Sequence, residues 1–365
     1  NEGRFRLVGM PKGAGNRLIV LPNDDQHYIV REVDVPDPVG LGPAKMQIEL
    51  HRGIWITGRV TDKATAEPVA AVRLYYLPFR TNEFAQKLPE FDSDGNVDGD
   101  QARYQTKADG TYRLVGLPGR AIVGATSVLK DYRHGVGYDQ IDAPKHQKSD
   151  WLDTYRNPLS PSPKWPNVMK EINPPADATA ITLDLQLDPG QSMRIRVTDA
   201  AGNPLTGASM QFEPASQEAV LTATNFGPSE SRPLVLRHQE KNLGRVITVG
   251  PEQLAAGEIT VALQPVATVS GRIVNEDRVA VAGLAIDPRV LPFGDFGQHL
   301  QTVATDADGR FQTTLLPGCK YTFAGMGGGF QYAEIVHELQ IQPGETKDLG
   351  TLKLDKDGKV TTWKP

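Results

Sequence analysis

The stretch GTYRLVGLP (residues 110–118) recurs as GRFQTTLLP (residues 309–317) and GRFRLVGMP (residues 3–11). In all three copies a glycine begins the stretch, an aromatic residue follows two positions later and a proline ends it. An Asp-Gly pair opens the two later copies, and alternating apolar residues follow. Because glycine supplies the positive φ of tight turns, this pattern predicts a hairpin turn that leads into a β-strand. We call these stretches the Gly-aromatic segments, and their repetition indicates a chain of similar modules.

Opening segments are a second repeated feature. They are alternating strands rich in β-branched residues, and they read IWITGRVTD from residue 54, MRIRVTDAAGNPLTGASMQF from residue 193 and VSGRIVNEDRVAVAGLAI from residue 269. Alternation places every second side chain on the same face of a strand. We therefore expect Val60, Val197 and Ile273 at one equivalent inward position. We expect Gly58 and Gly271 at turns or bends.

Closing segments end each module. They read MQIELHRG (46–53), ITLDLQLDPG (181–190), ITVALQP (259–265) and LGTLKLDKDG (349–358). All but the last run almost directly into the next opening segment, so neighbouring domains are expected to be semi-rigidly coupled. The predicted division is a partial β-sandwich with C-terminal strands only at 1–52, a β-sandwich with a long insertion at 53–190, a small atypical β-sandwich at 191–265 and a β-sandwich at 266–365. The insertion covers about residues 130–175.

The first module lacks an opening segment. Residues 1–52 start at the Gly-aromatic segment. We expect either that the natural gene product extends upstream or that another chain contributes the missing strands. Because unpaired strand edges are templates for strand addition, the sequence predicts other protein chains as partners, with self-assembly through this incomplete N-terminal domain as one form.

The set TGRVTD, PVAAVRLYY, TKADGTYRLVGLPG and ATS within residues 57–127 resembles the carboxypeptidase regulatory-like domains. The resemblance covers the 53–190 and 266–365 modules well, and residues 1–52 in part. It implies an all-β fold of tandem transthyretin-like or Ig-like β-sandwiches, as in large bacterial surface proteins. Such domains are accessory modules in peptidases, receptors, adhesins and cell-surface arrays, so the resemblance implies little about activity.

Composition excludes several classes of protein. The 365 residues include 39 Lys and Arg against 44 Asp and Glu, a net charge of −5, which argues against a nucleic-acid-binding surface. The single cysteine, Cys319, rules out internal disulfides and cysteine-rich metal sites, and we expect it to be a buried or half-buried structural thiol. The sequence has no run of 18 apolar residues, so direct membrane insertion is not predicted. The 36 glycines and 28 prolines indicate many turns, and short helices are predicted only near 82–87, 149–154 and 251–256.

Catalytic motifs are missing from the sequence, which predicts that the chain is not an enzyme. The histidines lack the spacing of a zinc site. Ser127 and Lys130 form a lone Ser-x-x-Lys pair without its companion motifs. The run at 325–329 (GMGGG) lacks the Lys-Ser/Thr of a phosphate loop, and we expect it to let a strand bend or the backbone pass closely.

The acidic stretch DSDGNVDGD (residues 92–100) is the one candidate metal site. Asp94, Asn96, Asp98 and Asp100 fall at alternate positions of an EF-hand-like loop, where oxygen ligands suit Ca²⁺. Gln105 stands where the bidentate Glu of such a loop belongs, so the predicted affinity is low. An unliganded polar turn is the alternative. No other cofactor is predicted.

The insertion carries candidate partner-binding aromatic residues. These are Tyr132, Tyr138, Trp151, Tyr155 and Trp165. Exposed aromatics can anchor a protein partner or stack on a sugar, whereas buried ones would pack the insertion onto its own domain. All three alternatives stay open at the level of sequence.

Repeated sandwiches, short connections and the missing catalytic motifs together favour a non-catalytic, extracytoplasmic structural or adhesive protein or assembly component, at the cell surface, secreted or periplasmic. The alternative is a glycan- or peptide-binding accessory region of a larger secreted or membrane-anchored enzyme.

Overall fold

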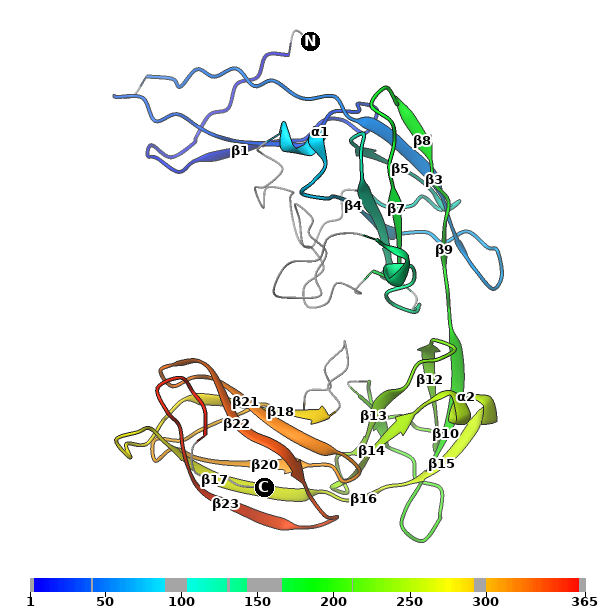
Figure 1. The fold of residues 1–365 in the computed structure, drawn as a ribbon, viewed down its shortest axis with the longest axis vertical. Coiled ribbons are helices and arrows are strands. Elements are labelled where there is room, and N and C mark those ends of the chain that lie inside the picture. Colours follow the sequence, from blue (N-terminus) through cyan, green and yellow to red (C-terminus); the bar gives the residue numbers. More distant parts are fainter. Residues whose placement is uncertain are drawn as a thin grey trace. The chain divides into compact units, whose positions relative to one another are not determined.

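The computed structural model describes residues 3–40, 42–88, 104–129, 132–142, 166–211, 213–291 and 300–360. The chain forms two compact units, Asn1–Pro189 and Gly190–Pro365, and each is described by itself. Nearly all of the regular secondary structure in both is strand, which confirms the predicted all-β class (Figure 1). The predicted division into four modules stays a prediction.

The first unit contains a β-sandwich formed by two sheets. One sheet has the order β5-β3-β8, with β9 also paired to β3, and the other has the order β4-β6-β7. The strands are β3 (Ile54–Asp62), β4 (Val72–Pro78), β5 (Thr111–Gly116), β6 (Ala121–Ser127), β7 (Val168–Ile172), β8 (Ala180–Thr182) and β9 (Leu185–Leu187). Side chains from both sheets meet in one apolar core, among them Val60, Leu74, Tyr112 and Val123.

Ahead of this sandwich lies a separate two-stranded antiparallel sheet. It consists of β1 (Arg17–Val20) and β2 (Arg31–Asp34), paired from Arg17↔Asp34 to Val20↔Arg31. Two strands alone cannot enclose a core, so this sheet depends on neighbouring elements for stability.

The second unit contains two β-sandwiches in succession. The first joins the sheet β12-β10-β15 to the sheet β11-β13-β14-β16. Its strands are β10 (Gln191–Thr198), β11 (Ser209–Met210), β12 (Val220–Phe226), β13 (Arg232–His238), β14 (Leu243–Val249), β15 (Glu258–Ala262) and β16 (Gln264–Pro265).

The last sandwich joins the sheet β20-β17-β23 to the sheet β19-β18-β21-β22. Its strands are β17 (Ala267–Val274), β18 (Leu284–Leu291), β19 (Val303–Ala304), β20 (Arg310–Leu315), β21 (Lys320–Gly327), β22 (Phe330–Gln340) and β23 (Thr346–Lys353). Gly328 and Gly329, both with positive φ, form the two-residue turn between β21 and β22. An added Cβ on Gly327 would lie 3.0 Å from the carbonyl oxygen of Gly283, a close approach of backbone of the kind predicted for the GMGGG run.

In all three sandwiches the opening segment forms the middle strand of a three-stranded arrangement. β3, β10 and β17 each pair antiparallel with one neighbour and parallel with the closing segment on the other side. Their inward side chains Val60, Val197 and Ile273 are fully buried, which confirms the predicted equivalence.

Two predictions about the repeated glycines are wrong. Gly110 and Gly309 do have positive φ, but the turn at Gly309 joins β19 and β20, which belong to opposite sheets, so it is not a hairpin. Gly58 and Gly271 lie within β3 and β17 and not at turns. They stand directly across from Tyr112 and Phe311, and an added Cβ on Gly271 would lie 2.9 Å from the Phe311 ring. The glycine therefore makes room for the aromatic ring.

Short helices occur at two of the three predicted places. α1 (Glu83–Gln86) starts at Asn82, whose Oδ1 accepts hydrogen bonds from the backbone N–H of Phe84 and Ala85. α2 (Pro251–Ala256) begins with proline and ends at Gly257 in the left-handed region. A 3₁₀ turn, η2 (Tyr138–Gln140), was not predicted. The stretch at 149–154 lies outside the described residues. None of the helices in the described part of the chain has the length and apolar composition needed to cross a bilayer.

Candidate functional site

The joint between the two sandwiches of the second unit is a continuous packed contact. Val235 of β13 and Val246 of β14 belong to the same apolar cluster as Leu316 of the following sandwich. The backbone N–H of Val246 donates to the carbonyl of Pro317 at 2.8 Å, and that of Val266 donates to the carbonyl of Asn242 at 3.0 Å. A joint with its own core and backbone hydrogen bonds resists bending.

Gly318 shows how tightly this joint is built. Its φ is +111°, and an added Cβ would lie 2.1 Å from the carbonyl oxygen of Val246. An added Cβ on Gly244 would lie 2.5 Å from the Leu316 side chain. Glycine is thus required on both sides of the joint, because backbone and side chains approach more closely than any Cβ permits.

The same end of the Gly-aromatic segment forms the joint in the first unit. Leu117, which corresponds to Leu316, clusters with Ile29 of the preceding N-terminal segment. An added Cβ on Gly53 would lie 2.4 Å from the carbonyl oxygen of Gly116 in the Gly-aromatic segment, and the backbone N–H of Gly53 donates to the carbonyl of His27 at 2.7 Å. The Leu-Pro-Gly end of each complete segment therefore contacts the part of the chain that precedes its sandwich. Sequence reasoning missed this role, although the repeated Leu-Pro was its signal.

The N-terminal Gly-aromatic segment differs from its two complete copies in exposure. Phe5 and Leu7 are 55% and 58% exposed, whereas Tyr112 and Phe311, at the Phe5 position, are each 4% exposed. Val8, Met10 and Ile19 are exposed as well. Residues 3–10 and 43–50 belong to no strand in the part of the chain that the structure describes. The apolar side chains of this segment are therefore left uncovered in the first unit.

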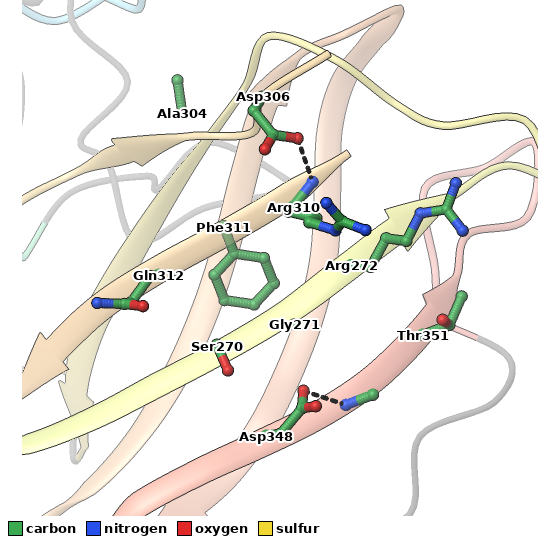
Figure 2. A pocket seen from close by; sticks show the side chains of 11 residues that line it. Ser270, Gly271, Arg272, Ala304, Asp306, Arg310, Phe311, Gln312, Asp348 and Thr351 are labelled. Carbon is green, nitrogen blue, oxygen red and sulfur yellow. Dashed lines mark hydrogen bonds between the residues drawn. The ribbon is translucent and has the colours of Figure 1, made fainter. Parts of the chain in front are cut away.

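An open pocket lies on the sheet β20-β17-β23 of the last sandwich (Figure 2). Arg272 and Arg310, which are cross-strand partners, line it together with Ser270, Asp306 and Asp348. Both carboxylates accept backbone hydrogen bonds: Asp306 from the N–H of Arg310 at 2.8 Å, and Asp348 from that of Gly350 at 2.9 Å. Arg310 is also paired with the carboxylate of Asp308 at 3.4 Å, and Arg272 donates to the carbonyl of Asp308 at 2.8 Å. The pocket therefore carries two guanidinium groups and two carboxylates, a lining that suits a polar ligand.

Two of the five predicted partner-binding aromatics lie among the described residues, and both are packed. Tyr132 is 1% exposed, and its hydroxyl donates to Oδ2 of Asp62 at 3.1 Å. Tyr138 packs against the cluster of Leu77, Phe79 and Met169. For Tyr132 the partner-binding interpretation is wrong, since its ring fills the core. Trp151, Tyr155 and Trp165 lie outside the described residues.

Asn167 fixes the base of the insertion. This buried side chain donates to the carbonyls of Tyr132 at 3.0 Å and Arg133 at 3.1 Å, and its Oδ1 accepts from the N–H of Ser127 at 2.8 Å. Asp188 holds the Arg133 side chain at 3.0 Å. The two ends of the insertion are thereby tied together at the sandwich.

The predicted metal site cannot be placed, because Asp94, Asn96, Asp98 and Asp100 lie outside the described residues. Within the described ranges, no three His, Cys, Asp or Glu side chains come together to hold a metal ion.

The lone thiol is a structural group. Cys319 is half-buried and packs against the core of the last sandwich, as predicted. Burial raises the pKa of the Cys319 thiol to about 11. Burial likewise raises the pKa of Tyr321, whose hydroxyl donates to the carbonyl of Leu316 at 2.8 Å. A nucleophilic thiol would need the opposite shift.

Comparisons with known proteins give no family. No protein-family model matches the chain. No curated protein matches it either. Among solved structures, it is similar to the Bacillus anthracis TIE protein at 11% identity and a TM-score of 0.23, over 89% of this chain and 54% of that one. It is also similar to a streptococcal ancillary pilin at 11% identity and a TM-score of 0.22, over 86% of this chain and 100% of that one. The major pilin SpaD from Corynebacterium diphtheriae shows 8% identity and a TM-score of 0.22, over 83% of this chain and 97% of that one. Likenesses at this level do not bear on function, which is inferred below from the residues themselves.

Proposed function

We propose that the chain is a non-catalytic structural or adhesive protein, or a component of an assembly, whose sandwiches are carboxypeptidase regulatory-like modules joined into rigid units. The observation that carries the proposal is the joint between the last two sandwiches. There, Val246 and Leu316 share one core, and Gly318 has no room for a side chain. A protein that must hold two surfaces at a fixed distance needs joints of this kind, whereas flexibly tethered modules do not.

Localisation and partners are part of the proposal. We place the protein outside the cytoplasm, at the cell surface, secreted or periplasmic, with other protein chains as its partners. The single, half-buried Cys319 and the net charge of −5 accord with this setting, since the sequence has no second thiol to keep reduced and no excess of basic residues. The aromatic residues of the insertion outside the described ranges, Trp151 and Trp165 among them, remain candidates for contacting those partners.

Calorimetry tests whether the joint is rigid. We expect the unit Gly190–Pro365, within the full chain, to unfold as one cooperative transition, because its two sandwiches share a core. Val246→Ala, with Val279→Ala as an exposed control in the same unit, should separate this transition into two or lower its midpoint. Two independent transitions for the two sandwiches in the unmodified chain would contradict the proposal.

A binding role is the second candidate, and the pocket beside Arg272 and Arg310 favours it. As the accessory region of a larger enzyme, the chain would hold a polar glycan or peptide there through the guanidinium and carboxylate groups. Arrays of neutral and charged glycans and peptides test this role. Binding that Arg272→Ala abolishes would support it, and no binding on either array would remove it.

A further inference from the structure

The middle strand of one sheet has the same two kinds of neighbour in both sandwiches that contain a complete Gly-aromatic segment. In the last sandwich, β17 lies between β20, a Gly-aromatic segment, and β23, a closing segment. In the first unit, β3 lies between β5 and the closing strands β8 and β9. Two kinds of segment thus depend on one opening strand for their backbone hydrogen bonds.

The N-terminal region has both of these neighbours without the strand that separates them. Residues 3–11 are a Gly-aromatic segment, and residues 46–53 are a closing segment that aligns with 183–190. Ile48 and Leu50 are half-buried, whereas Leu185 and Leu187 at the same positions are buried. Phe5 shows the larger difference, since it is largely exposed where Tyr112 and Phe311 are buried.

The opening strands of the two sandwiches with a complete Gly-aromatic segment show which sequence would fit between residues 3–11 and 46–50. These strands share Ile56-Thr57-Gly58-Arg59-Val60 and Val269-Ser270-Gly271-Arg272-Ile273, a common pattern of Ile/Val, Thr/Ser, Gly, Arg and Val/Ile. The glycine stands opposite the aromatic ring, and the residue two positions later is fully buried between the sheets. An added Cβ on Gly58 would lie 1.9 Å from the carbonyl oxygen of Leu183 in the closing segment and 3.1 Å from the Tyr112 ring, and one on Gly271 would lie 2.9 Å from the Phe311 ring. A larger residue at this position would therefore meet the closing segment, the ring or both.

We propose that residues 3–11 and 46–50 are the two sides of a docking site for one β-strand of the pattern Ile/Val-Thr/Ser-Gly-Arg-Val/Ile. The strand pairs antiparallel with residues 3–11 and parallel with residues 46–50, and its glycine lies against Phe5. Docking covers Phe5 and Leu7 and gives the N-terminal region the same sheet order as the complete sandwiches. This inference does not rest on the structural role proposed above.

The strand comes from the same polypeptide, on the N-terminal side of Gly3. In both complete copies the opening strand precedes its Gly-aromatic segment, by 110 − 58 = 52 residues in one and 309 − 271 = 38 residues in the other. Within the described residues, β3 and β17 already serve their own sandwiches. A second copy of the chain therefore has no free strand of this pattern to donate among its described residues.

The docking site is tested with the chain's own opening strand as the probe. A segment with the sequence of residues 53–63 (GIWITGRVTDK) is joined to the N-terminus of residues 1–365 through a flexible Gly-Ser linker, which raises its effective concentration. Amide hydrogen exchange at residues 4–10 and 46–50 should slow by about ten-fold or more when the strand docks. The same extension with Gly58→Leu should lose most of this protection, because the side chain would meet the backbone at Met46, which aligns with Leu183, and the Phe5 ring.

Variants of the chain itself provide the controls. Phe5→Ser should reduce the protection given by the extension, and Val39→Ser, at a fully exposed position, should leave it unchanged. No slowing at either stretch overturns the proposal. Equal slowing by the Gly58→Leu extension overturns it as well, since contact would then be apolar and unspecific.

The source of the strand has its own test. The coding sequence upstream of Gly3 should contain the five-residue pattern with its glycine between about 38 and 52 residues before Gly3, the two spacings within this chain. Light scattering should find residues 1–365 monomeric. Absence of the pattern from that stretch, or a dimer that protects residues 4–10, overturns the assignment to the same polypeptide.

Discussion

Replacing Phe311 by alanine tests the placement of the Gly-aromatic segment in the core. The ring is buried between the sheets, lies edge-on to Phe323 at 6.4 Å between centroids and fills the space above Gly271. Truncating a fully buried Phe removes its transfer free energy and leaves a cavity, a loss of about 3–5 kcal/mol in the free energy of unfolding. The lost aromatic pair falls within that range. For a unit of this size, we expect the melting temperature of the second unit to fall by roughly 6–20 °C.

Equilibrium unfolding in urea, followed by circular dichroism and checked by calorimetry, measures this loss. Phe5→Ala is the matched control, because Phe5 occupies the same repeat position but is largely exposed. We expect the Phe5→Ala variant to lose less than about 1 kcal/mol. A loss in the free energy of unfolding well under about 1 kcal/mol for Phe311→Ala, or equal losses for both variants, would refute the reasoning that Phe311 is buried where Phe5 is exposed.

Three further predictions concern the joint, the insertion and the thiol. Gly318→Ala should cost at least about 2 kcal/mol, from positive φ and the contact with the Val246 carbonyl, while Gly257→Ala, with positive φ but open space, should cost about 1 kcal/mol; calorimetry compares them. Asn167→Ala should cost about 2–4 kcal/mol, because it leaves buried backbone groups unpaired, and denaturant unfolding of the first unit measures this. Since the folded pKa of Cys319 is raised from 9.0 to about 11, its contribution to stability is full below the unfolded pKa and declines as pH rises toward the folded one. Cys319→Ala should flatten the loss of melting temperature across that alkaline window, and an unchanged pH profile would contradict the assignment.

The sheet content and the core residues could be predicted because alternation and repetition both encode them. Val60, Val197 and Ile273 followed from the period-two pattern alone. The pairing of the turns could not be predicted in the same way. Asp-Gly fixes the conformation at Gly309, but the sheet that each flanking strand joins is decided by the core, which local turn chemistry does not specify.

Glycines and aromatics within the sandwiches show the same limit. A glycine in a strand carries no sign of which neighbour it accommodates, so Gly271 was expected at a bend and lies opposite Phe311. Tyr132 lies in an aromatic-rich insertion and was a candidate contact residue for that reason. Its hydroxyl instead donates to Asp62, 70 residues away in the chain. The joints were unpredictable for a related reason, since the packing of two different sandwiches brings Leu316 and Val246 into one cluster.

Amide hydrogen exchange across the three Gly-aromatic segments tests most directly the claim that the N-terminal copy lacks its middle strand. The account predicts slow exchange in β5 and β20, where an opening strand pairs with the segment, and fast exchange over residues 4–10 of the unmodified chain. Protection of residues 4–10 equal to that of β5, in the monomeric chain and without an added strand, would contradict it.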